Sequence, residues 1–348
     1  MSKKLLLIWL IIFAFFLRQE LASAENGFSV ADGSYNLDFP SDHGSHPKYS
    51  TEWWYFTGHL KTEQERTFGF ELVFFRIGLA VSKDGEIKKQ TSAWATENLH
   101  LAHFAITDDK EDRFTHYEKR SRGSFGAAGA TVGKLEVWNG SWRVAFNGDQ
   151  IELFAADGNE SLALTLKSKK PIVKHGENGL SKKGSGVGEA SYYTSFTRLE
   201  GDGKLTVSGN TFSVKASSWF DHEFTSSDNS RAQVGWDWFA IQLANGEEVM
   251  LYQLKDSTGK ISKYSSGTFV DVLGSTTKLN HEDFTITPSG EWKSPRTGIT
   301  YSSGWQIEIP AKQLSLKITP TIKDQELSTE KSTGVTYWEG RCKAIGKR

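Results

Sequence analysis

Two Asp-His pairs are the first side chains in this sequence that could move a proton. Asp42-His43 and Asp221-His222 each place a carboxyl group next to an imidazole, ahead of a stretch rich in tryptophan. Desolvation beside aromatic rings raises the pKa of a carboxyl group and keeps it available as a proton donor. Either pair could therefore do acid-base chemistry beside an aromatic cavity. The alternative is a structural role at a barrel entrance, which we favour for Asp42-His43 and weigh equally for Asp221-His222.

The stretch Trp236-Asp237-Trp238 could supply the aromatic wall of such a site. On a strand, Trp236 and Trp238 point to one face and Asp237 points to the other. If the tryptophan face lines a cavity, the two indoles could hold an apolar ligand or stabilise a carbocation through their π faces. The alternative is that both rings simply fill the core, as most buried tryptophans do.

An earlier stretch, Glu52 to Phe56, has the same aromatic character. Glu52, Trp54 and Phe56 would share one face of a strand, which puts a carboxyl group beside aromatic rings. The offset that aligns Trp53 with Trp236 also aligns Phe56 with Phe239, and an Asp-His pair precedes both copies. This repeat predicts two β domains built on one plan. We count Trp53, Trp54, Phe56 and Glu52, with the Asp42-His43 pair, as candidate ligand-binding residues.

The elements that must position these residues are strands. Short alternating apolar runs are separated by polar or glycine-containing turns, which is typical of an antiparallel β protein. The stretches Trp53 to Leu60 and Phe68 to Phe75 predict a hairpin. No helical periodicity of twelve or more residues follows the N-terminal segment, so we expect an all-β fold with few helices. Further strands are predicted at 100–106, 134–138, 142–146, 151–155, 162–166, 192–198, 305–309 and 314–318.

Composition excludes several classes of protein. The 348 residues carry a net charge of −1, which argues against a nucleic-acid partner because phosphate contacts need a clustered excess of Lys and Arg. The single cysteine, Cys342, excludes an intramolecular disulfide. Aromatic residues make up 13% of the chain, so much of the apolar content is large and favours strands.

The N-terminal segment predicts export. Lys3 and Lys4 precede an apolar run from Leu5 to Leu17, and Ala22-Ser23-Ala24 fits a signal peptidase site. The run is shorter than the roughly 20 residues that span a bilayer. We therefore expect a signal peptide at residues 1–24, cleaved after Ala24, a periplasmic or secreted protein, and no stable membrane span after cleavage.

Domain boundaries follow from the repeat. The glycine-rich stretch from His175 to Gly188 is the best candidate for a boundary or surface loop. We predict an N-terminal domain at residues 25–190 and a C-terminal domain at residues 191–348.

Metal and nucleophile signals are weak. His43 and His46, or His100 and His103, have a three-residue spacing that puts the two rings on opposite faces of a strand, so no metal is predicted. The sequence lacks the Gly-x-Ser-x-Gly elbow of a serine hydrolase, and no cofactor is predicted.

Six sets of motifs occur in a characteristic order along the chain. They are Ser41-Asp42-His43 with Glu52 to Gly58, Ala102 to Thr107, Ser191-Tyr192-Tyr193, Trp219 to Phe224, Gly235 to Phe239, and Tyr337-Trp338-Glu339-Gly340. Together they resemble the AttH and carotenoid hydratase family over essentially the whole chain after the signal peptide. The resemblance implies two lipocalin-like antiparallel β-barrel domains in tandem. It also implies hydrophobic substrates, because carotenoid 1,2-hydratases add water to a terminal double bond of acyclic carotenoids.

The resemblance also suggests a site in the second domain, where the hydratase is thought to use a His, a Trp, a Tyr and an Asp. The matching residue types here are His222, Trp236 or Trp238, Tyr252, and Asp221 or Asp237. Relatives usually continue past the Tyr-Trp-Glu-Gly motif with another strand. Because this chain stops at Arg348, we expect that strand to be shortened or absent.

These observations lead to one main functional hypothesis and two alternatives. The main hypothesis is a lipocalin-like protein that binds a lipophilic small molecule such as an isoprenoid, a carotenoid or a lipid. As an enzyme it would have hydratase or isomerase chemistry: a neutral Asp221 or Asp237 protonates a double bond, tryptophans stabilise the cation, and His222 orients water. The first alternative is a non-catalytic lipid carrier or envelope accessory protein. The second is a secreted hydrolase of unknown mechanism.

Overall fold

The computed structural model describes residues 27–79, 96–226 and 233–348, so the predicted signal peptide lies outside the described residues. The described part is built from strands and contains no α-helix. Its short 3-10 turns are η1 (Ser41–His43), η2 (Ser124–Gly126) and η4 (Pro310–Lys312). No helix in these ranges is long and apolar enough to cross a membrane. The prediction of an all-β chain is confirmed.

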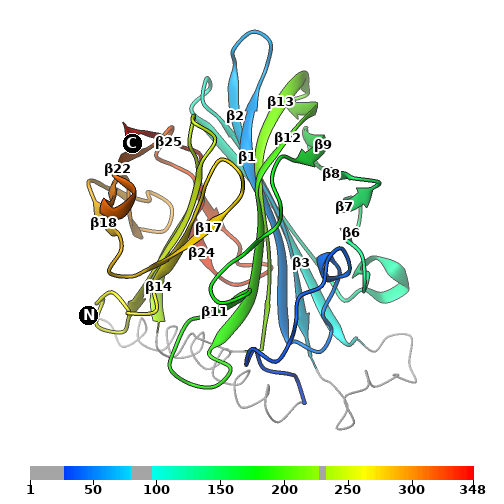
Figure 1. The fold of residues 1–348 in the computed structure, drawn as a ribbon. Helices are drawn as coiled ribbons and strands as arrows, with labels where there is room; N and C mark the ends of the chain where they lie inside the picture. Colours follow the sequence, from blue (N-terminus) through cyan, green and yellow to red (C-terminus); the bar gives the residue numbers. More distant parts are fainter. Residues whose placement is uncertain (1–26, 80–95, 227–232) are drawn as a thin grey trace, which may run out of the picture.

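A single large sheet contains most of the chain up to residue 225. It is antiparallel, in the order β4-β3-β2-β1-β13-β12-β9-β8-β7-β6-β5, with β10 and β11 paired to β12. It curls into a nearly closed barrel (Figure 1). Its strands are β1 (Thr51–Lys61), β2 (Thr67–Gly78), β3 (Asn98–Asp108), β4 (Arg113–Ser121), β5 (Ala128–Ala130), β6 (Glu136–Asn139), β7 (Trp142–Asn147), β8 (Gln150–Asp157), β9 (Glu160–Ser168), β10 (Val173–Lys174), β11 (Leu180–Lys182), β12 (Ala190–Val207) and β13 (Asn210–Thr225).

A second unit follows from residue 233 onward. Two four-stranded sheets, β14-β15-β16-β17 and β18-β21-β22-β25, form its body, and β19-β20 and β23-β24 are two short hairpins. The strands are β14 (Gln233–Gln242), β15 (Glu248–Asp256), β16 (Ser266–Val270), β17 (Thr276–Asn280), β18 (Thr285–Pro288), β19 (Glu291–Lys293), β20 (Thr300–Ser302), β21 (Trp305–Ile309), β22 (Leu314–Pro320), β23 (Glu326–Ser328), β24 (Thr336–Trp338) and β25 (Cys342–Lys347). A strand therefore does follow the Tyr-Trp-Glu-Gly motif, because β25 pairs with β22.

The two units separate later in the chain than the sequence indicates. The boundary predicted between residues 190 and 191 falls at the start of β12, yet β12 and β13 belong to the first sheet. β13 pairs with β1 along its length, and β12 pairs with β9. The change from the first sheet to the second falls between Thr225 and Gln233. The physical reason is that β12 and β13 complete the first barrel by pairing with strands far away in the sequence.

Alternation along the strands builds the core of the first barrel. Trp54 and Phe56 on β1 are fully buried and point inward with Leu72 on β2 and Phe104 on β3. Successive residues of a strand point to opposite faces, so the intervening residues face outward. That outward face of β1, β2, β3 and β13 is covered by the second unit, whose own core lies between its two four-stranded sheets.

Candidate functional site

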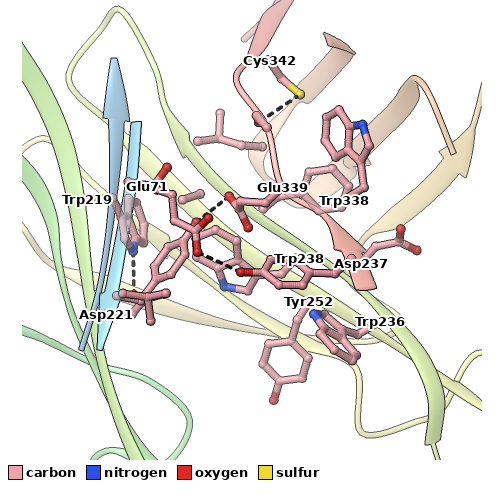
Figure 2. Close-up of a pocket in the computed structure, with 18 of the residues that line it drawn as sticks. Glu71, Trp219, Asp221, Trp236, Asp237, Trp238, Tyr252, Trp338, Glu339 and Cys342 are labelled. Atoms are coloured by element: carbon pink, nitrogen blue, oxygen red, sulfur yellow. Dashed lines mark hydrogen bonds between the residues drawn. The ribbon is translucent and has the colours of Figure 1, made fainter. Parts of the chain in front are cut away.

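A large cavity lies between the two units. Its volume is about 1920 Å³, above the roughly 300–1,000 Å³ of most small-molecule pockets. One wall is the outward face of β1, β2, β3 and β13, and the other is formed by β14, β15 and the segment from 333 to 348. The cavity also reaches the core of the second unit, because Phe239, Trp305 and Leu316 line it as well. Figure 2 shows some of the side chains that line it.

Strand register brings Asp221 into the middle of this wall. Asp221 on β13 pairs with Tyr55 on β1, and Ser195 on β12 pairs with Asp221 from the other side. Directly paired residues of an antiparallel sheet hold their side chains close together on one face. The acid therefore sits in a row of polar and aromatic groups that crosses three strands.

Asp221 is held by hydrogen-bond donors in a buried place. Tyr193 donates its hydroxyl to Oδ2 at 2.8 Å, and Trp219 donates its indole N–H to Oδ1 at 2.6 Å. Ser195 also donates to Oδ1. Burial raises the pKa of Asp221 to about 7, and these three hydrogen bonds offset only part of that effect. Near neutral pH the carboxyl group can therefore act as a proton donor or an acceptor.

An aromatic chain runs from Asp221 across the cavity. Trp238 on β14 donates its indole N–H to the Tyr193 hydroxyl at 3.1 Å, so Trp238 is linked to Asp221 through Tyr193. The Trp238 ring meets the Tyr55 ring edge to face, with centroids 5.3 Å apart. A ligand lying against Trp238 would thus touch both units and approach the acid.

The other predicted residues of the second unit also face the cavity, with different surroundings. Asp237 forms an ion pair with Lys255 at 2.6 Å, whereas the hydrogen bonds described for Asp221 come from neutral groups. Trp236 lines the cavity and is 62% exposed. Tyr252 is buried, and its hydroxyl shares a hydrogen bond of 3.0 Å with Ser181. Of the predicted residues on β1, Trp53 is the one that lines this cavity.

The remaining predicted residues do not line the cavity. They are Asp42, His43, Glu52, Trp54, Phe56 and His222. Because the side-chain period of a strand is two, Asp221 and His222 point to opposite faces of β13. His222 stacks on Trp54, with ring centroids 4.9 Å apart, inside the barrel. The expectation that His222 orients water beside Asp221 is therefore wrong.

Glu52 is the centre of a buried polar cluster at one end of the first barrel. His222 and His46 lie 2.9 and 2.8 Å from its Oε1, and Arg76 donates to its Oε2 at 3.0 Å. Burial alone would raise the pKa of Glu52, but the two histidines and the Arg76 charge hold it well below its usual value. Asp42 accepts a hydrogen bond from Tyr35, which extends the cluster.

His46, Glu52 and His222 could in principle supply metal ligands, because their ligand atoms lie within 4.8 Å of one another. Most of these ligand atoms already have a hydrogen-bond partner within the protein. Arg76 places a positive charge on the same carboxylate, and Asp42 lies 3.2 Å from His46 Nε2. The nearby His43 is not one of the three possible ligands. Its ring packs against aromatic rings such as that of Phe196, with centroids 5.1 Å apart. The cluster therefore fits a structural role.

Sequence reasoning missed two carboxyl groups in the cavity, Glu71 and Glu339. Glu71 lies on β2 in an apolar run, and Glu339 follows β24 in the Tyr-Trp-Glu-Gly motif. The alternation of side chains along β2 could have revealed Glu71. Leu72 points into the core, so the neighbouring Glu71 must point outward. Tyr193 was also missed as a partner of Asp221, although Ser191-Tyr192-Tyr193 was one of the motifs of the resemblance.

Comparison with known proteins identifies the family. The AttH-like family model matches residues 30–348, and the chain belongs to that family. An AttH-like protein from Nitrosomonas europaea has a similar crystal structure, with 28% identity, a TM-score of 0.82, and coverage of 92% of this chain and 95% of that one. This match confirms the predicted lipocalin-like two-barrel architecture. Kievitone hydratase from Nectria haematococca shares the fold at 14% identity and a TM-score of 0.62, covering 86% of this chain and 85% of that one. No curated protein sequence matches the chain.

Proposed function

We propose that this protein binds a lipophilic small molecule in the cavity between its two units and acts on a carbon–carbon double bond of that molecule. The observation that carries the proposal is Asp221, a buried carboxyl group whose pKa is raised to about 7, on the wall of an aromatic cavity. Such an acid is partly protonated near neutral pH, and the protonated form can give its proton to a weak base such as an alkene. Export after cleavage at Ala24 remains part of the proposal.

The reaction would begin with transfer of the Asp221 proton to one alkene carbon, which leaves a cation on the neighbouring carbon. Trp238 and Tyr55 line the cavity, and their aromatic rings would stabilise the positive charge. In a hydration, a water oxygen bonds to the cation and the Asp221 carboxylate takes one of the water protons. In an isomerisation, the carboxylate takes a proton from an adjacent carbon. Both routes return Asp221 to its starting form.

Two features of this site support the assignment. The hydrogen bonds from Tyr193, Trp219 and Ser195 fix the orientation of the carboxyl group before a ligand arrives. The fold is shared with a protein named as a hydratase, and that name supplies the reaction class to test first. At 14% identity, the structural similarity to kievitone hydratase shows a shared fold and does not show a shared reaction.

The test uses the protein without its signal peptide and two acyclic isoprenoids, lycopene and squalene, as probes. Binding would be followed by quenching of tryptophan fluorescence, and products by mass spectrometry. Hydration adds the mass of one water, whereas incubation in deuterium oxide reveals isomerisation by deuterium uptake. We expect Asp221→Asn to keep binding and lose turnover, and the exposed control Asp202→Asn to keep both.

Two outcomes would contradict the enzyme assignment. Turnover that survives in Asp221→Asn would remove this residue as the acid. A lipid that co-purifies from the native host in stoichiometric amount and is returned unchanged after incubation would favour the carrier alternative.

A further inference from the structure

The cavity contains a second polar centre that the proposed reaction does not use. Glu71 comes from β2 in the first unit and Glu339 from the segment after β24 in the second, and both line the cavity. Tyr55 donates its hydroxyl to Glu339 Oε1 at 2.6 Å, and Tyr337 donates to Glu71 Oε1 at 3.1 Å. Figure 2 shows the two carboxyl groups together near Trp338.

One oxygen of this pair has no partner. Glu71 is only 3% exposed, and its Oε2 is buried without a hydrogen bond from any described residue. Buried polar atoms in proteins are nearly always paired, so an unpaired carboxyl oxygen in a cavity wall indicates a group that is supplied from outside the chain.

The pair also lacks a compensating positive charge among the described residues. Neither carboxyl group forms an ion pair there, and the nearby Arg341 is committed to Asp109. Burial, and then the neighbouring Glu339, raise the pKa of Glu71 well above its usual value, and burial raises the pKa of Glu339 to about 7. A cation placed between them would relieve this repulsion and favour ionised carboxylates.

A purely structural explanation is that the two carboxyl groups share a proton. A shared proton would lower the repulsion and could also bond Glu71 Oε2, so this explanation predicts no preference for an amine over an uncharged ligand. An ammonium group has three donors and could reach oxygens of both carboxylates. Aromatic walls suit a cation as well, and Tyr55, Tyr337 and Trp338 all line this part of the cavity.

We propose that Glu71 and Glu339 form a subsite for the protonated amine of a lipophilic ligand, whose apolar body lies against Trp238 and Tyr55. This inference rests on the proposed binding of a lipophilic molecule and narrows its class to amphiphilic amines. Tyr55 joins the two centres of the cavity, because its ring contacts Trp238 and its hydroxyl binds Glu339.

The test compares two ligands that differ only in the head group, dodecylamine and dodecanol. Their affinities for the protein without its signal peptide would be measured by calorimetry at pH 7, below the concentration at which either aggregates. We expect the amine to bind at least about tenfold more tightly than the alcohol. Glu71→Gln should abolish that preference and leave the alcohol affinity unchanged. Glu63→Gln, in an exposed turn, is the matched control and should keep the preference.

The possible results separate this inference from the proposed function. Equal affinity for amine and alcohol would overturn the inference and leave the lipophilic site in place. An amine preference that survives in both Glu71→Gln and Glu339→Gln would also overturn it. If neither ligand binds, this inference fails, and the lycopene and squalene measurements decide the proposed function separately. Thermal melting of each variant checks folding, and Glu339→Gln provides the decisive measurement if Glu71→Gln does not fold.

Discussion

At the scale of single residues, the proposed chemistry depends on the groups that raise and lower the pKa of Asp221. Three neutral donors stabilise its charged form, yet burial outweighs them and the pKa rises to about 7. The folded-state pKa lies above the unfolded value of 3.8. Asp221 therefore stabilises the fold fully below about pH 4, and this contribution is lost as the pH rises through 7. The protonated fraction of Asp221, which the proposed reaction requires, falls as the pH rises through 7.

Tyr193→Phe tests this balance directly. Loss of the Tyr193 hydrogen bond removes one group that favours the carboxylate, so we expect the pKa of Asp221 to rise by roughly one unit. The measurement is a carbon-13 NMR titration of labelled aspartate carboxyl groups, with Asp221→Asn to assign the signal. Tyr192→Phe is the control, because the Tyr192 hydroxyl binds the backbone at Gly33 and Tyr35 instead. An Asp221 signal that titrates near pH 4 would contradict the proposed acid.

At the scale of elements, β1 shows how one strand serves two purposes. Its residues alternate between the barrel core and the cavity, so neighbours in the sequence have different tasks. Trp54 is fully buried in the core, and Trp53 lines the cavity. The sequence predicts Trp53 and Trp54 together as candidate ligand-binding residues. Because successive residues of a strand point to opposite faces, only one of the two rings can line the cavity.

Truncation of the two neighbouring tryptophans should give opposite results. We expect Trp54→Ala to lower the free energy of unfolding by about 3–5 kcal/mol, because it leaves a large void in the core. Trp53→Ala should cost much less stability and should weaken dodecanol binding. Urea denaturation and calorimetry measure the two effects. A large loss of stability in Trp53→Ala with unchanged binding would show that this ring fills the core instead of lining the site.

At the scale of the whole molecule, the cavity exists because the second unit is anchored on the outer face of the first. Glu248 on β15 is fully buried and binds Arg198 and Lys170 of the first unit, each at 2.6 Å. His103 on β3 and Tyr337 on β24 are joined by a hydrogen bond of 2.9 Å. These contacts hold the two walls of the cavity in place.

Glu248→Gln should weaken this anchor. Removing the carboxylate leaves two buried cations without their partner, which typically costs about 3–5 kcal/mol. We expect a lower melting temperature together with weaker dodecanol binding. The control is Glu200→Gln, whose ion pair with Lys169 is exposed and should contribute less than about 1 kcal/mol. Unchanged melting and binding in Glu248→Gln would show that the units are held by other contacts.

Much of the fold could be predicted from local pattern. The hairpin of β1 and β2, and the strands at 305–309 and 314–318, follow from alternation and turn residues. Alternation also explains why Glu52, Trp54 and Phe56 share one face, as expected. The candidate site was predicted in part: Asp221, Trp238 and Tyr252 line the cavity, whereas His222 and Glu52 belong to the barrel interior.

The amino-acid sequence by itself determined the all-β class, most strand positions and which residues of a strand share a face, because these depend on side-chain periods within a few residues. Only the tertiary structure decided that the cavity lies between the units. The pairing of Asp221 with Tyr55 and the approach of Glu339 to Glu71 join residues more than a hundred positions apart. Such contacts depend on how whole sheets curl and pack, and no local pattern in the sequence records that.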